Sequence, residues 1–128
     1  NWAGISDLIA GREDIDGRDL TADVIGKPPK ITQPLLFHYP HVWGPRGPGY
    51  EPHSSIRLGD WKAIYFYQPQ RWELYNLKND LGEAENLAST HPERLKKLSD
   101  RMKTEHDRRD AQYPANRETK EPESPNWR

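Results

Sequence analysis

The chain has 128 residues, of which 33% are hydrophobic, 30% are charged and twelve are proline. This length suits one domain that buries roughly two-thirds of its unfolded surface, and the polar composition predicts a small core with loose ends. A formal net charge of −1 gives no global attraction to nucleic acid or to an anionic membrane, and the absence of cysteine excludes disulfides, cysteine zinc sites and a thiol nucleophile.

The N-terminal part predicts short helical pieces. The chain begins at Asn1 without a signal peptide or an initiator Met, which indicates a fragment or a processed product. Residues 1–11 place apolar side chains at helical spacing and predict the last turns of a helix. Residues 19–25 predict one or two further helical turns, stopped by Gly26. Nowhere in the sequence does an apolar run approach the roughly 18 residues of a membrane span, so none is expected.

The densest run of aromatic and β-branched residues follows, and it predicts an antiparallel sheet. Gly59-Asp60 predicts a two-residue type II′ turn, because glycine adopts positive φ at little cost. The Gly- and Pro-rich segment 44–52 predicts a loop, either a plain surface connector or one shaped for a ligand. The strands are expected at residues 35–40, 54–58, 61–67 and 72–77.

The middle strand, residues 61–67, is largely apolar on both faces. Trp61, Ala63, Tyr65 and Tyr67 alternate with Lys62, Ile64 and Phe66. A strand of this kind needs cover on both sides, and a downstream helix supplies one cover. We therefore expect the second sheet face to pack on another domain and the isolated chain to self-associate through it.

Residues 91–109 predict that helix. Residues 90–93 form a possible capping box with Pro92 in the first turn, and Leu95, Leu98 and Met102 make a narrow apolar stripe. The polar segment 114–128 predicts either a disordered tail or an extended strap over a neighbouring surface. The fold class expected is α+β, a small four-stranded antiparallel sheet with one packed C-terminal helix.

Candidate site residues cluster around the first strand and the loop after it. Aromatic faces stack on sugar rings, and Arg or His donates to sulfate or carboxylate oxygens, so this set predicts the edge of a pocket for an anionic sugar. The alternative is that the aromatic residues are core and the histidines are satisfied surface groups. The candidates are His38, His41, Trp43, Arg46 and Arg57.

Other chemistries receive less support from the sequence. His38 and His41 are three apart, but Pro40 argues against a helix and a strand would point them to opposite faces, which disfavours a metal site. Serine lacks a partnering base in any recognisable motif. Lys62 is expected to extend its charged end to solvent or to pair with Glu73 across the hairpin, rather than to act as a base.

Several segments, taken together, resemble the C-terminal part of the type I sulfatases, in particular the arylsulfatase and N-sulphoglucosamine sulphohydrolase group and its bacterial members that act on sulfated glycans. The most specific feature is an IR-x-GDWK hairpin followed by an LYNL-x-x-D-x-GE-x-x-NL corner. The segments are IDGRDL (15–20), LLFHYPHVWG (35–44), SSIRLGDWKAIYFY (54–67), ELYNLKNDLGEAENLA (73–88) and HPERLKKL (91–98).

The resemblance implies an alkaline-phosphatase-like enzyme whose large N-terminal domain holds a formylglycine nucleophile and a calcium ion, with no cofactor in this chain. It divides the chain into the end of the large domain (1–34), the C-terminal subdomain (35–113) and a polar tail (114–128). The partners implied are that N-terminal sulfatase domain and a sulfated sugar, and the location implied is periplasmic or secreted.

By the same resemblance, the chain is not catalytic alone. It closes the cleft of a sulfuric ester hydrolase and contributes substrate contacts, for which His38 and His41 are the first choices. The alternative function is a stand-alone sugar-binding or protein-interaction module that kept the fold and lost the enzyme.

Overall fold

The computed structural model describes residues 24–27, 33–41, 50–116 and 118–127. The chain divides into two units, residues 1–31 and 32–128. In the first unit, Val24 is helical and Gly26 has a φ of 72°, as expected of a glycine that ends a helix. The helix expected over residues 1–11 lies outside the described residues.

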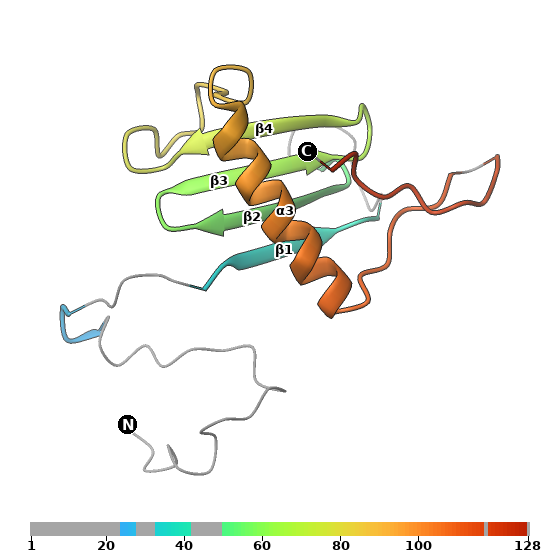
Figure 1. Cartoon of the computed structure of the whole chain (residues 1–128), viewed down its shortest axis with the longest axis horizontal. Helices are drawn as coiled ribbons and strands as arrows, with labels where there is room; N and C mark the ends of the chain where they lie inside the picture. The colour runs from blue at the N-terminus through green and yellow to red at the C-terminus, as the bar shows by residue number, and fades with distance from the viewer. Residues whose placement is uncertain (1–23, 28–32, 42–49, 117, 128) are drawn as a thin grey trace, which may run out of the picture. The chain divides into compact units, whose positions relative to one another are not determined.

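The second unit contains an antiparallel sheet of four strands in the order β1-β2-β3-β4, with helix α3 packed on it (Figure 1). Gly59 has the positive φ that the hairpin prediction required, at 61°. Tyr67 continues the pairing beyond β3, because its N–H donates to the Pro52 carbonyl oxygen at 3.0 Å. The elements are β1 (Leu35–Tyr39), β2 (His53–Leu58), β3 (Trp61–Phe66), β4 (Arg71–Asn76) and α3 (Pro92–Arg108).

Helix α3 begins one residue later than the predicted capping box requires. His91 is the N-cap residue and makes no side-chain cap bond, so the capping-box prediction is wrong. The physical reason is that the Thr90 hydroxyl turns back and donates to the Leu87 carbonyl oxygen at 3.2 Å. Pro92 occupies the first turn as predicted, since its missing N–H would have no partner there.

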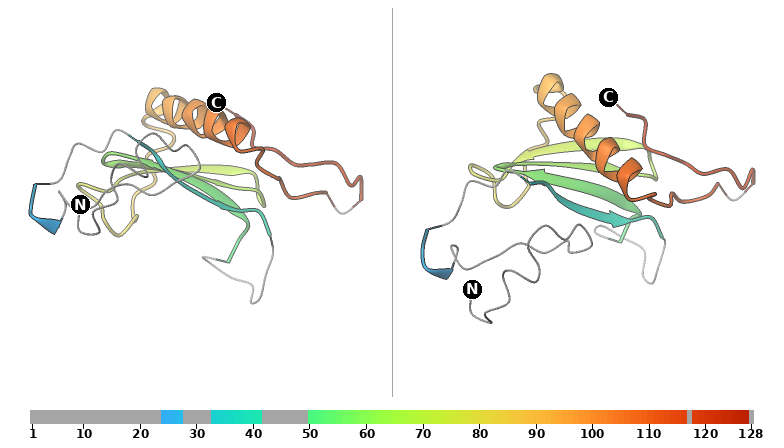
Figure 2. Two further views of the ribbon diagram at one scale, coloured as in Figure 1. Left: turned by 90° about the horizontal axis from the view of Figure 1, so that it is seen from below. Right: turned by 60° about the horizontal axis from the view of Figure 1, so that its bottom comes forward.

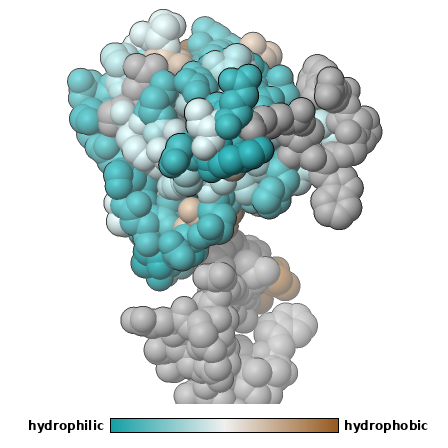
Figure 3. All heavy atoms as spheres, turned by 90° about the vertical axis from the view of Figure 1, so that its right-hand side faces the viewer, coloured by the Kyte–Doolittle hydropathy of each residue, from teal (hydrophilic) through white to brown (hydrophobic). Residues whose placement is uncertain are grey.

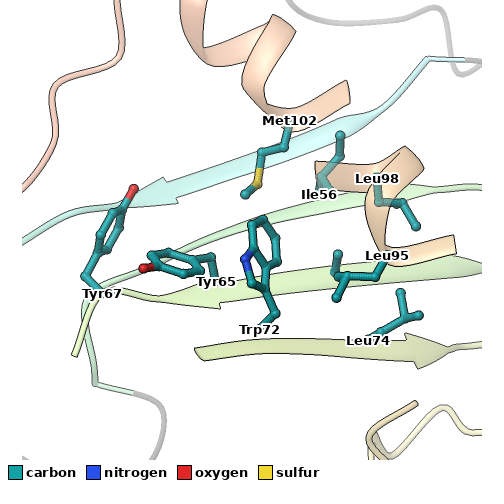
Figure 4. Packing of buried hydrophobic residues seen from close by; sticks show 9 residues of the cluster. Ile56, Tyr65, Tyr67, Trp72, Leu74, Leu95, Leu98 and Met102 are labelled. Carbon is teal, nitrogen blue, oxygen red and sulfur yellow. The ribbon is translucent and has the colours of Figure 1, made fainter. Parts of the chain in front are cut away.

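One face of the sheet forms the core with α3 (Figure 4). The predicted stripe of Leu95, Leu98 and Met102 is confirmed, and all three side chains are buried. They pack against Ile56, Ala63, Tyr65, Trp72 and Leu74 of the sheet. Each such side chain contributes roughly 1.5 to 3 kcal/mol when fully buried, which makes this interface the main source of stability.

The C-terminal half of α3 also buries a charged residue that the stripe did not include. Glu105 is buried and pairs with Arg101 at 2.7 Å, with Arg108 at 3.3 Å and with Arg109. Burial acts to raise the pKa of Glu105, but the three guanidinium groups outweigh it and lower that pKa below its usual value. Through these three ion pairs, the ionised Glu105 stabilises the last two turns of the helix.

The described residues 110–116 and 118–127 form an extended strap, as the second of the two expectations for segment 114–128 required. They turn back on themselves through a bridge between Ala115 and Pro122. The Trp72 indole N–H then donates to Asn126, at 3.0 Å to the side-chain oxygen. The Trp127 ring packs against Trp72 and is part of the core periphery. Figures 1 and 2 show the chain leaving the end of α3, turning and running back toward the sheet. Seen from the side of the strap, the described residues are mainly hydrophilic (Figure 3).

The loop between β4 and α3 is ordered by its own side chains. Asp80 accepts hydrogen bonds from the N–H groups of Ala84 at 3.0 Å and Glu85 at 2.9 Å. These N–H groups lower the pKa of the Asp80 carboxyl. Asn86 accepts from the Leu74 N–H at 3.1 Å and so joins the loop to β4. The corner motif of the sequence thus builds a loop.

Candidate functional site

The segment with the two predicted histidines lies at the end of β1. Leu36 and His38 share the face that α3 covers, because Leu36 is paired with Ile56 and His38 with Ser54. Pro40 is buried and ends the strand, and His41 is exposed immediately after it. Trp43 and Arg46 lie outside the described residues. Of the two candidate histidines in this segment, His41 is exposed to solvent and His38 is half-buried.

His38 is held between the sheet and the strap by both ring nitrogens. A carbonyl oxygen only accepts, so Nε2 carries the proton and donates to the Gln112 carbonyl oxygen at 2.7 Å. In the neutral ring, Nδ1 then accepts from the Ser54 hydroxyl at 2.6 Å, and Ser54 accepts from the Tyr67 hydroxyl at 2.8 Å. In this series of hydrogen bonds, the Gln112 carbonyl oxygen determines which group is the donor and which is the acceptor at every step.

This arrangement brings a serine and a histidine together, but it does not make a nucleophile. The Ser54 side chain is fully buried, at 0% exposure, so no substrate can reach its oxygen. The neighbouring Tyr67 is also buried, and burial raises the pKa of its phenol. A buried polar network that is satisfied throughout rigidifies a core. We assign the chain of bonds to the positioning of β1 and the strap.

A second histidine, His106 of α3, packs beside this network, and the sequence analysis did not single it out. Its ring centroid lies 4.7 Å from that of His38, and its Nδ1 is 3.2 Å from the Tyr113 hydroxyl. It is 1% exposed, and its Nε2 has no hydrogen-bond partner among the described residues. Burial, followed by the nearby His38, lowers the pKa of His106 from 6.5 to about 4. The signal was available, because His106 lies four residues after Met102 and extends the apolar stripe.

The described members of the predicted pocket set, His38, His41 and Arg57, do not lie on one face of the sheet. Arg57 lies in β2 opposite Lys62 of β3, on the sheet face away from α3, whereas His38 lies on the α3 side. The Arg57 Nε donates to the Gly59 carbonyl oxygen at 3.3 Å. His38 has both ring nitrogens occupied, and His41 is exposed. Sugar contact by these residues stays a prediction.

The predicted pair of Lys62 with Glu73 is wrong. Lys62 lies opposite Tyr75, and Glu73 lies opposite Ile64, so the two charges are only diagonal neighbours. Lys62 instead bonds to Glu83 of the following loop at 2.7 Å. Glu73 forms an ion pair with Arg71 of its own strand, with 2.9 Å between Arg71 Nε and Glu73 Oε1. The register of β3 and β4 decides these partners.

Within the described part of the chain, no group of three or more His, Asp or Glu side chains is placed to hold a metal ion. The helices within the described ranges include none that is long and apolar enough to cross a membrane. An open hollow at the start of α3 contains none of the predicted site residues. Its lining is Thr90, His91, Pro92, Glu93, Arg94 and Lys97.

Known proteins support the resemblance seen in the sequence. No family model matches the chain. The chain is 49% identical over 47 residues to an uncharacterized sulfatase of Schizosaccharomyces pombe (strain 972 / ATCC 24843), a match that covers 34% of this chain and 8% of that protein. The chain therefore spans a small part of the relative that it matches.

Two solved structures share the architecture. BT4656, solved in complex with its substrate D-glucosamine-2-N,6-O-disulfate, matches with a TM-score of 0.59 and 24% identity over 77% of this chain and 21% of that one. Ps i-CgsB, solved in complex with k-i-k-neocarrahexaose, matches with a TM-score of 0.56 and 18% identity over 88% of this chain and 25% of that one. The expected α+β class is confirmed, and the chain carries a sulfatase-related fold similar to a part of those proteins.

Proposed function

We propose that this chain is the C-terminal subdomain of a sulfatase, a sulfuric ester hydrolase that acts on sulfated glycans or aryl sulfates. The observation that carries the proposal is the 49% identity to a sulfatase over 47 residues. The structure shared with BT4656 and Ps i-CgsB over most of this chain supports it at the level of the fold. In this proposal a larger domain, with formylglycine and calcium, performs hydrolysis.

The subdomain contributes to the cleft through the segment that follows β1. His41 is exposed directly after Pro40, and Trp43 follows two residues later, so an imidazole and an indole are close along the chain. An imidazolium donates to sulfate oxygens, and an indole face stacks on a sugar ring. His38 fixes the direction of this segment from the interior through its bonds to Ser54 and Gln112.

The test is sulfate-ester hydrolysis by two proteins, this chain alone and the full-length product of the gene that encodes it. A chromogenic aryl sulfate and sulfated disaccharides serve as substrates, with calcium present. We expect activity only in the full-length product. His41→Ala should lower kcat/KM there by about 10- to 100-fold, the size of one charge-assisted hydrogen bond. His91→Ala, at another exposed histidine, is the matched control and should retain activity.

Two results would contradict the proposal. Hydrolysis by the isolated chain would place the catalytic groups within these residues. A full-length product that hydrolyses none of these esters, while the isolated chain still binds a sulfated sugar, would favour the stand-alone binding module. Calorimetric titration of the isolated chain with a sulfated disaccharide distinguishes this second result.

A further inference from the structure

Two groups of contacts join the strap to the sheet and the helix. Near the start of the strap, the Gln112 carbonyl oxygen accepts a hydrogen bond from His38 Nε2 at 2.7 Å. Near its end, the Asn126 side-chain oxygen accepts from the Trp72 indole N–H at 3.0 Å. Between these contacts, the described residues from 114 to 123 bond to one another, and this part projects away from the sheet and α3 (Figures 1 and 2). The strap can therefore leave the sheet without breaking the hydrogen bonds between the strands.

The first group of contacts buries a histidine of α3 under the strap. His106 is 1% exposed, and its ring centroid lies 5.7 Å from that of Tyr113 and 5.7 Å from that of Trp127. On the sheet side, the ring centroid of His38 is 4.7 Å away. The His106 Nδ1 lies 3.2 Å from the Tyr113 hydroxyl, whereas Nε2 has no hydrogen-bond partner among the described residues. Since Tyr113 and Trp127 belong to the strap, departure of the strap would open this site to water.

The attached strap disfavours a proton on His106. Burial is the main cause, and the nearby His38 and Arg109 act in the same direction, so the pKa of His106 is lowered from 6.5 to about 4. Of the charged groups that face the ring, Asp107 favours a positive charge. The strap contributes the Tyr113 phenol, whose pKa is raised by burial, so it stays uncharged. Protonation would place a cation at a nitrogen without a described acceptor, which destabilises the attached arrangement.

Detachment of the strap would return His106 to water and bring its pKa back toward 6.5. The detached form then binds a proton more tightly than the attached form, so the ratio of detached to attached form must rise as pH falls. Because the pKa is lower in the attached form, that form is favoured fully above pH 6.5 and loses its advantage as pH falls toward about 4. From about pH 7 to about pH 5 the ratio should rise about 20-fold.

We propose that the strap detaches from α3 and β1 when His106 takes up a proton, and that this detachment uncovers Trp72 while the sheet and the helix remain folded. The helix keeps its own contacts with the sheet, through residues such as Leu98 and Met102. The uncovered surface is aromatic, since Trp72 is 5% exposed and its ring centroid lies 5.0 Å from that of Tyr65. All of these contacts lie within this chain, so the detachment is independent of the proposed sulfatase function.

Hydrogen exchange of the Trp72 indole N–H tests the detachment. The full-length product of the gene is labelled with ¹⁵N-tryptophan, and exchange is followed by NMR at pH 7 and pH 5, with each rate compared with that of free tryptophan at the same pH. The Trp72 indole should lose about 20-fold in protection between the two pH values.

The same protein shows whether the opening is local. Protection of the Trp72 indole should be at least about tenfold lower than that of the backbone amides of β3, measured by mass spectrometry against unstructured peptides. It should also change little in about 1 M urea, because a local opening exposes little surface, whereas the protection of β3 should fall.

Two variants identify the group that titrates. His106→Gln removes the imidazole and keeps a polar side chain, and His106→Leu fills the site with an apolar one, since Nε2 has no described partner to replace. In at least one of them, Trp72 should keep its pH 7 protection at pH 5 to within about twofold. His91→Gln is the matched control, because it removes an exposed imidazole at the other end of α3 and should retain the change of about 20-fold.

Three results would overturn the proposal. Equal protection of Trp72 at pH 7 and pH 5 would show that acid does not move the strap. Protection of Trp72 that equals that of β3 and falls with it in urea would show that the strap opens only with the whole fold. Protection at pH 5 that is no higher in either His106 variant than in the wild type would assign the titration to another group.

Discussion

His106 should make the stability of this fold depend on pH. The unfolded chain binds a proton at this histidine near its ordinary pKa of 6.5, whereas the folded chain binds it only near pH 4. Stability is therefore full above the unfolded value and is lost as pH falls between the two values. The difference of about 2.5 pKa units corresponds to about 3 kcal/mol in total, of which about 2 kcal/mol is lost between pH 7 and pH 5.

The physical reason lies in the surroundings of the ring. His38, Tyr113 and Trp127 pack around His106, with ring centroids 4.7, 5.7 and 5.7 Å away, and none of these side chains is acidic. Arg109 also disfavours a positive charge there, and only Asp107 favours one. Protonation would place a cation in a site where Nε2 has no described partner.

Urea unfolding at pH 7 and at pH 5 measures this dependence. The wild-type midpoint should fall by about 1 M in urea between the two pH values. His106→Gln removes the titrating group, so its midpoint should change with pH by much less. Thr104→Gln, at an exposed position of the same helix, introduces the same side chain and keeps His106, so its profile should stay parallel to the wild type. Parallel profiles for His106→Gln and the wild type would refute the reasoning, as would an NMR titration of His106 near pH 6.5.

Three further substitutions test other contacts by the same urea measurement, with Thr104→Ala as the exposed control. Ser54→Ala removes the centre of a buried hydrogen-bond chain and should destabilise the fold by about 1 to 3 kcal/mol; a loss below that range would mean that water replaces the hydroxyl. Trp127→Ala should cost about 1 to 3 kcal/mol and speed exchange of the Trp72 indole N–H, whereas unchanged exchange would show that the strap does not protect it. Glu105→Gln should cost about 1 to 2 kcal/mol at pH 7. Because the folded pKa of Glu105 is lowered, that difference should vanish as pH falls through the folded value, and a difference that persists in acid would contradict the ionic role.

The sheet and the helix were predictable from local patterns. Period-two alternation fixed the strands to within a residue or two, and glycine at position 59 fixed the hairpin. The stripe of Leu95, Leu98 and Met102 fixed which side of α3 faces the sheet. These features depend on neighbours within a few residues, so the sequence contains them directly.

Contacts between distant residues could not be predicted from the sequence. His38 bonds to Gln112, 74 residues away, and Trp72 bonds to Asn126, 54 residues away. Whether His38 lines a pocket or a core depends on which sheet face the helix and strap cover, which alternation alone does not decide. The packing of Trp127 on Trp72 could not be predicted for the same reason, since it depends on a turn several residues earlier.

The residues of the two motifs that resemble sulfatases have structural roles in this fold. In the corner motif, Asp80 and Asn86 accept backbone N–H groups, and in the hairpin motif Gly59 supplies the turn. Asp60 accepts from the Leu77 N–H at 2.7 Å through its backbone carbonyl, which joins the two motifs. Each of these residues builds the sheet or its loops, so the shared pattern is a signature of the fold. In the proposed function, contacts with a substrate come from other positions, of which the exposed His41 is the described residue most directly open to test.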